Sequence, residues 1–168
     1  EGQSATSDLY AGHALKNGDS DVFNSGAAGY LLSRETIKKL IAKWDEKDAT
    51  CWLDDSTGNN KKWLQENPGL VTARCLASLG IRAIDTRAAQ KWHRFHAFPL
   101  TRVVAGQVDE WYKNKHQGLA ELAGFDESYE TLLSGVDCCS MDTISFHYVE
   151  WKESKALFAI TGELLANP

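Results

Sequence analysis

Residues 135–149 read Gly-Val-Asp-Cys-Cys-Ser-Met-Asp-Thr-Ile-Ser-Phe-His-Tyr-Val and combine two adjacent cysteines with a run of alternating side chains. Alternation with a period of two predicts a β-strand. One face would carry Ile144, Phe146 and Tyr148, and the other Ser145, His147 and Val149. Judged by periodicity alone, a strand histidine is more often structural than a metal ligand, so both roles stay open for His147 at this point.

Length and composition predict one globular domain. The chain has 168 residues, a formal charge of −5 and 43% hydrophobic residues. We therefore expect a single domain over residues 1–168 with a flexible end at residues 1–7. No basic stripe interleaved with aromatic residues occurs, which argues against nucleic-acid binding. No apolar run could cross a bilayer and no secretory signal is visible, but the chain begins with Glu1, so we expect a processed or truncated product.

The cysteine count fits a secreted or lumenal protein. The chain has four cysteines, Cys51, Cys75, Cys138 and Cys139. They allow three pairings, and the sequence alone does not show which one forms. A zinc site fits poorly, because the chain has no Cys-x-x-Cys or His-x-x-x-His spacing.

Local patterns predict alternating strands and helices in the first half of the chain. We expect a short strand at residues 9–12, a turn at 16–19, and a helix capped by Ser33 with its apolar side at Ile37, Leu40, Ile41 and Trp44. A second helix should begin at Asn67-Pro68, bury Val71, Cys75, Leu76 and Leu79, and end at Gly80. A strand is expected at residues 81–84.

The second half is less regular. We expect a functional or interface loop at residues 85–99, which is rich in His, Arg and aromatic residues. At residues 111–136 we expect one helix within a long loop. Leu157, Ile160, Thr161 and Leu164 outline a terminal amphipathic helix.

Three segments are candidates for ligand binding, and each has a structural alternative. The small residues at 25–29 suit either close approach to a ligand or tight packing against a helix. Asp85-Thr86-Arg87 follows a predicted strand, where α/β proteins gather ligand-binding groups, but an internal ion pair fits equally well. Asp19-Ser20-Asp21 matches a metal-binding Asp-x-Asp, although its place after Asn17-Gly18 favours a turn.

Taken together, these segments resemble glycosyltransferase family 31, the inverting core 1 β1,3-galactosyltransferases. Residues 23–33, Phe-Asn-Ser-Gly-Ala-Ala-Gly-Tyr-Leu-Leu-Ser, resemble the family's Ser-Gly-Gly-Ala-Gly-Tyr-Val-Leu-Ser block. Residues 73–76, 85–87 and 95–99 resemble its Gly-Arg-Cys-Met, Asp-Ser-Arg and Phe-His-Pro-Phe segments. Residues 138–149 are similar to its Cys-Cys-Ser to Ser-Phe-His-Tyr-Val signature, and the five matches occur in family order.

The resemblance implies an α/β fold of the GT-A (Rossmann-like) type that uses a UDP-sugar and Mn²⁺ in the Golgi lumen or secretory pathway. By position, His147 would be a metal ligand, which reverses the structural reading, and Cys51 and Cys75 would form a disulfide. Substrate-binding residues would be Gly26, Ala27, Gly29, Tyr30, Asp85, Arg87 and His96 in the cleft, with Trp111 and Tyr112 near a glycan or glycoprotein acceptor. The reaction implied is transfer of a hexose, galactose, to a glycan hydroxyl in β1,3 linkage with inversion.

Two departures from the family pattern matter. The family's own Asp-x-Asp lies upstream of every segment matched here, so the chain resembles only the C-terminal portion of a GT-A catalytic domain. An N-terminal half would be its partner, and any membrane anchor would lie in a segment absent here. The family's Glu-Asp pair precedes the Arg-Cys helix. An ungapped alignment puts Pro68-Gly69 there, whereas a two-residue insertion brings Glu66-Asn67 to that position and makes Glu66 the candidate base, with Asp54 and Asp55 as weaker candidates. The alternative is a non-catalytic member that acts as a chaperone or as a structural component of a secreted glycoprotein assembly.

Overall fold

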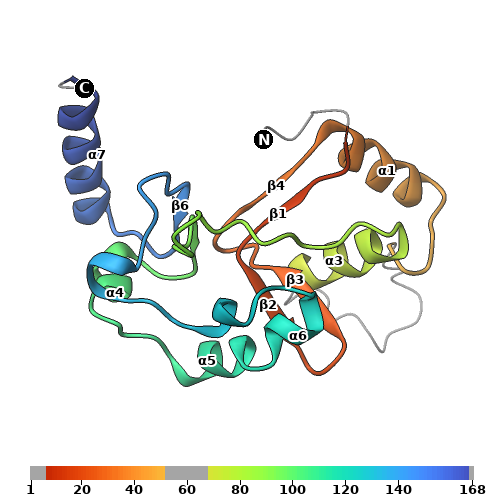
Figure 1. Cartoon of the computed structure of the whole chain (residues 1–168). Coiled ribbons are helices and arrows are strands. Elements are labelled where there is room, and N and C mark those ends of the chain that lie inside the picture. Colours follow the sequence, from red (N-terminus) through yellow and green to blue (C-terminus); the bar gives the residue numbers. More distant parts are fainter. Residues whose placement is uncertain (1–6, 52–67, 167–168) are drawn as a thin grey trace.

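The computed structural model describes residues 7–51 and 68–166, and the side chains of these residues up to Ala159. Glu66, Asp54, Asp55 and the predicted helix cap Asn67 lie outside the described residues, as do residues 1–6 of the predicted N-terminal end. The described chain is a mixed α/β structure (Figure 1). Its elements are β1 (Tyr10–Gly12), β2 (Ala14–Asn17), β3 (Asp21–Asn24), β4 (Tyr30–Leu32), α1 (Arg34–Asp45), α3 (Pro68–Ser78), β5 (Phe95–His96), α4 (Leu100–Val104), α5 (Glu110–His116), α6 (Leu119–Ala123), η2 (Glu127–Glu130), η3 (Gly135–Asp137), β6 (Ser145–Phe146) and α7 (Trp151–Ala166).

The strands form three small sheets of two strands each among the described residues. β1 pairs with β4 and β2 with β3, both antiparallel, while β5 and β6 pair in parallel. The predicted strand at residues 9–12 is confirmed as β1. The turn predicted at 16–19 is displaced, because Lys16 and Asn17 belong to β2 and the turn between β2 and β3 lies at 18–20. The predicted strand at residues 81–84 is wrong. Only Ile84 pairs there, through an isolated parallel bridge to Ala11.

α1 begins as predicted at Ser33, whose hydroxyl accepts a hydrogen bond from the Thr36 N–H at 3.1 Å. The predicted apolar side of this helix is only partly buried. Leu40 is buried, whereas Ile37, Ile41 and Trp44 keep 43%, 47% and 43% of their surface exposed. This helix of 12 residues lies on the outside of the described chain, so only the side chains that face the rest of the described chain can be buried.

α3 packs against β3 and supplies much of the core. Cys75 and Leu76 are fully buried as predicted, but Leu70 is also buried and takes the place expected for Val71, which is half-buried. The helix ends at Gly80 (φ +75°), where the Gly80 N–H donates to Ala77 O and the Ile81 N–H donates to Leu76 O. These two bonds form a Schellman motif, whose left-handed residue favours glycine.

Residues 111–136 contain more structure than the single predicted helix. α5 and α6 are separated by Gly118 (φ +74°), and two short 3₁₀ helices, η2 and η3, follow. A left-handed residue breaks a helix, so two short helices form where the side-chain pattern suggested one. Leu119, Ala120 and Tyr129 from this region are buried in the core.

The predicted terminal helix is confirmed as α7, which extends from the end of the molecule beyond α4 (Figure 1). Its first turn is tied to α4, because Glu153 Oε1 accepts a hydrogen bond from the Thr101 N–H at 3.1 Å. Leu157 is half-buried and Phe158 is 80% exposed. The side chains of the predicted positions Ile160, Thr161 and Leu164 lie outside the described part. No helix of the described chain is long and apolar enough to cross a membrane.

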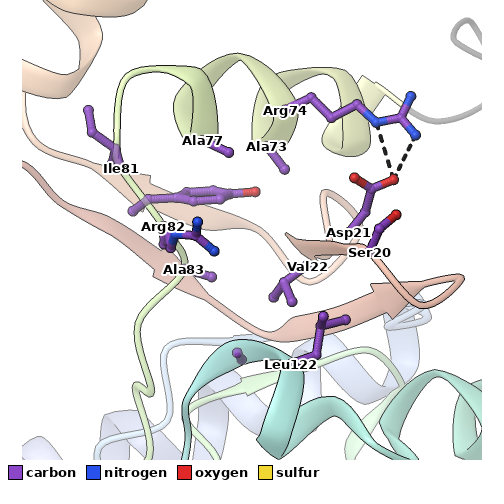
Figure 2. A pocket seen from close by; sticks show the side chains of 12 residues that line it. Ser20, Asp21, Val22, Ala73, Arg74, Ala77, Ile81, Arg82, Ala83 and Leu122 are labelled. Atoms are coloured by element: carbon purple, nitrogen blue, oxygen red, sulfur yellow. Dashed lines mark hydrogen bonds and ion pairs between the residues drawn. The ribbon is translucent and has the colours of Figure 1, made fainter.

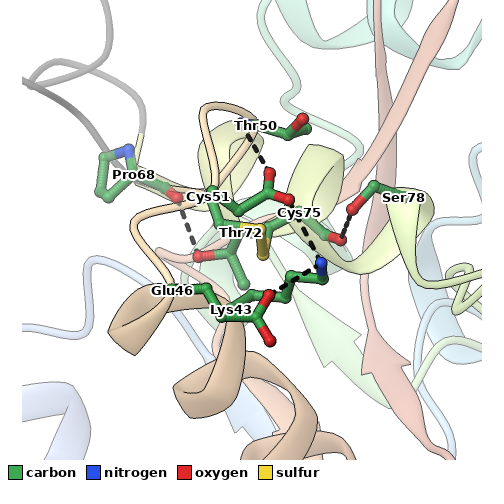
Figure 3. The surroundings of a disulfide bond; sticks show 9 residues. Lys43, Glu46, Thr50, Cys51, Pro68, Thr72, Cys75 and Ser78 are labelled. Atoms are coloured by element: carbon green, nitrogen blue, oxygen red, sulfur yellow. Dashed lines mark hydrogen bonds and ion pairs between the residues drawn. A yellow bond between two sulfur atoms is a disulfide. The ribbon is translucent and has the colours of Figure 1, made fainter.

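The disulfide between Cys51 and Cys75 is confirmed and joins the segment after α1 to the middle of α3 (Figure 3). Lys43 of α1 lies next to it and forms ion pairs with Glu46 at 3.1 Å and Asp48 at 3.2 Å. The bond spans a sequence separation of 24 residues, so it constrains a long loop of the unfolded chain.

We predict that Cys51→Ser with Cys75→Ser lowers the free energy of unfolding by about 3 kcal/mol, because the unfolded chain regains the entropy of that loop. Urea unfolding of both proteins under non-reducing conditions measures the difference. The matched control is Cys138→Ser with Cys139→Ser, since a bond between neighbours closes no long loop. An equal loss in both variants would contradict this explanation.

Candidate functional site

The predicted strand around Phe146 is present but shorter than expected. Only Ser145 and Phe146 form β6, and the chain turns at Tyr148 (φ +58°), so the predicted alternation over residues 144–149 is wrong beyond these two residues. β6 is held by β5, because Ile144 N–H donates to Arg94 O at 2.7 Å and His147 N–H donates to His96 O at 3.0 Å. The rings of His96 and Phe146 stack with centroids 4.6 Å apart.

The small-residue loop before β4 meets β6 from the other side. Gly26, Ala27 and Gly29 form a turn closed by the Gly29 N–H to Gly26 O bond at 3.2 Å. Ser145 donates its hydroxyl to the carbonyl of Ala28, so the loop and the signature segment touch directly. Tyr30 lies at the start of β4 with its ring edge-on to Tyr10 at 5.5 Å. The structure therefore brings together two segments that are more than 100 residues apart.

Asp85 and Arg87 form an ion pair inside the molecule. Arg87 Nη2 lies 2.7 Å and Nε 3.0 Å from the two carboxylate oxygens of Asp85, and the Arg87 side chain is only 2% exposed. The third nitrogen of the Arg87 guanidinium, Nη1, donates to the Ser128 hydroxyl at 3.1 Å, and the guanidinium lies over the ring of Tyr129 at 4.6 Å from its centroid. Burial alone would raise the pKa of Asp85, but the hydrogen bonds from Arg87 outweigh it and hold the pKa below its ordinary value.

Trp111 and Tyr112 stand next to each other on α5 but have different surroundings. Trp111 is 47% exposed, and its indole N–H donates to Asp109 at 3.1 Å. Tyr112 is buried, and its hydroxyl lies 2.7 Å from the Nε2 atom of His13. Phe98 contacts both rings, with centroids at 6.0 Å and 5.0 Å. Of the two predicted acceptor contacts, Trp111 offers the accessible ring.

Sequence reasoning missed a cluster of buried histidines next to these segments. His13, His93 and His116 converge with His96 although they are far apart in the sequence, and all four are buried. Burial lowers the pKa of His93 to about 3 and the pKa values of His96 and His116 to about 4, and it lowers the pKa of His13 well below its ordinary value. These imidazoles are therefore neutral near pH 7. The only sequence signal was a set of five histidines without regular spacing.

Cys138 and Cys139, whose partners were not predicted, form a disulfide with each other. The bonded pair lies beside the histidine cluster. Cys139 forms an isolated parallel β-bridge with His93, and the Ser140 N–H donates to His93 O at 2.9 Å. The backbone contacts of Cys139 and Ser140 with His93 thus hold the start of the signature segment against the segment that leads into β5.

A pocket of about 90 Å³ lies apart from the predicted site, between α3 and the β2–β3 hairpin (Figure 2). Arg74 pairs with Asp21 at its edge at 2.6 Å. Asp21 belongs to the Asp-x-Asp match at residues 19–21, so in this structure the carboxylate is committed to an arginine. This agrees with the turn reading of that motif.

One comparison with known proteins bears directly on the family. Over 145 residues, 84% of this chain, the sequence is 26% identical to glycoprotein-N-acetylgalactosamine 3-beta-galactosyltransferase 1 of Xenopus laevis. The chain is a distant relative of the core 1 β1,3-galactosyltransferases. It spans about a third of the length of that relative, 34%. No family model matches the sequence.

The Mn²⁺ site that the galactosyltransferase resemblance implies needs more ligands than the described residues offer. His147 is half-buried, and its ring lies against Tyr148 with centroids 3.6 Å apart. Among residues 7–51 and 68–166, no three His, Cys, Asp or Glu side chains converge as they would around a metal ion. Carboxylate and imidazole ligands around one cation are the usual requirement, so the described residues alone do not fit such a site.

We predict that Asp85→Ala lowers the free energy of unfolding by about 3 kcal/mol, because it leaves the buried Arg87 guanidinium without its partner. Thermal or urea unfolding measures the loss. Asp19→Ala is the matched control, since this exposed aspartate lies in the hairpin turn and its removal should change stability by less than about 0.5 kcal/mol. Equal stability of both variants would show that the Asp85–Arg87 pair does not hold the segment.

Proposed function

We propose that this chain is the C-terminal part of a GT-A glycosyltransferase that moves galactose from UDP-galactose to a glycan hydroxyl in β1,3 linkage. The observation that carries the proposal is the match over 84% of the chain to a relative named for this activity on glycoprotein N-acetylgalactosamine. The contacts described above add support. The loop at residues 26–30 touches β6, and β6 pairs with β5, so the segments with the strongest family resemblance form one contiguous region.

In this proposal the acceptor hydroxyl oxygen attacks the anomeric carbon of the donor, and the bond from that carbon to the diphosphate oxygen breaks. A base removes the hydroxyl proton, which is the role proposed for Glu66. UDP leaves with the bonding electron pair, and attack from the opposite face inverts the anomeric configuration. Trp111 would cover the acceptor sugar with its exposed ring, while Gly26, Ala27, Gly29 and Tyr30 would line the cleft. His96 is buried and stacked on Phe146, so it would position β6 rather than touch the substrate.

Asp85 and Arg87 have a narrower role in this proposal than direct substrate contact. Because the Arg87 side chain is nearly inaccessible and bound to Asp85, the pair acts as a positioning unit for the neighbouring backbone. The Tyr112 hydroxyl is likewise hydrogen-bonded to His13, so Tyr112 would position α5, the helix that carries Trp111.

The donor half of the site would come from polypeptide outside this chain, and Mn²⁺ would be the cofactor. His147 would be this chain's contribution to the metal. A bound divalent cation would neutralise charge on the leaving diphosphate. The two disulfides and the family resemblance fit a protein of the secretory pathway, in the Golgi lumen or outside the cell.

The proposal predicts galactose transfer by the native protein, assayed together with any polypeptide that co-purifies with it. The donor is UDP-galactose and the acceptor a peptide carrying N-acetylgalactosamine, with and without added Mn²⁺. His147→Ala should reduce transfer by roughly 100-fold and shift the Mn²⁺ dependence to higher concentrations, because one ligand is lost. Met141→Ala, an exposed residue of the same segment, is the control and should keep wild-type activity. A folded wild-type protein without transfer would favour the non-catalytic chaperone or structural role.

The same assay tests the base. Glu66→Gln keeps the shape of the side chain but cannot take up the acceptor proton, so the turnover rate should fall by about 10² to 10⁴. The Mn²⁺ dependence should not change in this variant. If turnover is normal, the base is another residue, and Asp54→Asn and Asp55→Asn are the next variants to measure.

A further inference from the structure

The histidine cluster lies at the junction of two parts of the described chain. His13 sits between β1 and β2, His116 ends α5, and His93 precedes β5. The Nε2 atoms of His13 and His116 lie 3.1 Å apart, and the hydroxyl of Tyr112 lies 2.7 Å from the same His13 atom. The rings of His13 and His93 have centroids 5.0 Å apart. Each of the three histidines is at least nine-tenths buried.

We propose that His13, His93 and His116 form an acid-sensitive latch, which holds α5 and α6 against the β2–β3 hairpin when the imidazoles are neutral and releases them when the imidazoles are protonated. The proposal does not depend on the catalytic role discussed above. It rests on the geometry of the cluster and on the described acidic side chains nearby, Glu130 and Asp85, being bonded to other partners.

The contacts across this junction show why the latch would matter. His13 carries the hydrogen bonds to His116 and Tyr112. Other side-chain bonds between the same parts are the Ala14 N–H to the Tyr129 hydroxyl at 3.1 Å and Lys115 Nζ to Lys16 O at 3.3 Å. A large share of the side-chain hydrogen bonds across the junction therefore involves the imidazole of His13.

Protonation would be costly because the nearby charged groups are already committed. Glu130 faces His116, but its carboxylate accepts the N–H groups of Gly118 at 2.9 Å and Ala120 at 3.0 Å. Asp85 faces His93 and is held by Arg87, whose own positive charge also faces His93. His13 faces the imidazoles of His93, His116 and His96 and the hydroxyl of Tyr112, and only the backbone of Phe95 favours its protonation among the described groups that act on it. If both His13 and His116 were protonated, their Nε2–H groups would point at each other, and neither could accept the hydrogen bond between them.

Unused hydrogen-bonding atoms and a cavity give water a place to enter. Nδ1 of His13, Nδ1 of His116 and Nε2 of His93 make no hydrogen bond of normal geometry within the described chain. A cavity of about 30 Å³ borders His13, His93 and Tyr112, together with Cys138 of the adjacent disulfide. A cavity of this size can hold a water molecule where polar atoms line it, so water at this place would reach the imidazoles of His13 and His93.

The sign of the pH dependence follows from the folded-state pKa values, which lie below the ordinary value of 6.5. The stabilisation is complete above about pH 6.5 and is lost as the pH falls, because the open and unfolded states bind protons that the closed state excludes. Below about pH 6, each such imidazole raises the unfolding constant about tenfold per pH unit. The carboxylates with lowered pKa values, such as Asp85, respond only below their ordinary value near 3.8 and do not act in this window.

The test is urea unfolding at pH 7.5, 6.0 and 5.0 with EDTA present. The wild-type unfolding constant should rise steeply between pH 6.0 and 5.0, and His116→Gln should remove about one factor of ten from that rise. His147→Gln is the matched control, because this histidine lies outside the cluster, and its pH dependence should equal that of the wild type. Equal wild-type unfolding constants at pH 7.5 and 5.0, or an unchanged pH dependence in His116→Gln, would overturn the proposal.

A second measurement uses only the wild-type protein and so does not depend on folding of a variant. Hydrogen exchange of backbone amides is followed at pH 7.5 and 5.0 and corrected for the intrinsic rate. Protection of α5 should fall at pH 5.0 by a larger factor than protection of α3, which packs on β3 and loses protection only through global unfolding. A constant ratio of α5 to α3 protection at the two pH values would overturn the latch.

Discussion

The structure depends on a buried corner at residues 12–14, where the chain passes from β1 to β2. Buried backbone groups must be hydrogen-bonded, and this corner finds its partners in three distant segments. Gly12 O accepts from the Thr86 hydroxyl at 2.9 Å, His13 O accepts from the Ser25 N–H at 2.8 Å, and Ala14 N–H donates to the Tyr129 hydroxyl at 3.1 Å. Sheets of two strands are marginally stable by themselves, so the corner and the core around it hold the segments in place.

The corner also explains how the candidate site is assembled. Ser25 begins the loop that reaches β6 through Ala28, and Thr86 lies between Asp85 and Arg87. Arg94, which accepts at its carbonyl from Ile144, donates its own side chain to Thr86 O at 3.1 Å. Hydrogen bonds thus link the loop before β4, the segment around Thr86, β5 and β6 to one another. This is the arrangement expected when loops, rather than one large sheet, carry ligand-binding residues.

Local signals were read well from the sequence, and long-range ones were not. The Ser33 cap and the Gly80 end of α3 were predictable because each depends on a few neighbouring residues. The pairing of β5 with β6 joins residues 50 positions apart, and no local pattern indicates it. The histidine cluster was missed for the same reason, since His13 and His116 are each far in the sequence from His93 and from one another. The exposed side of α1 could not be foreseen, because the apolar spacing shows a face but not what covers it.

The placement of the site is tested most directly by amide chemical-shift mapping of the isotope-labelled protein, together with any polypeptide that co-purifies with it, during titration with UDP-galactose and diamagnetic Mg²⁺ in place of Mn²⁺. We expect the largest shift changes at residues 24–30, 85–87, 95–98 and 145–149, where the family-like segments meet. Changes confined to α3 and the β2–β3 hairpin, around the pocket of Arg74 and Asp21, would contradict this placement.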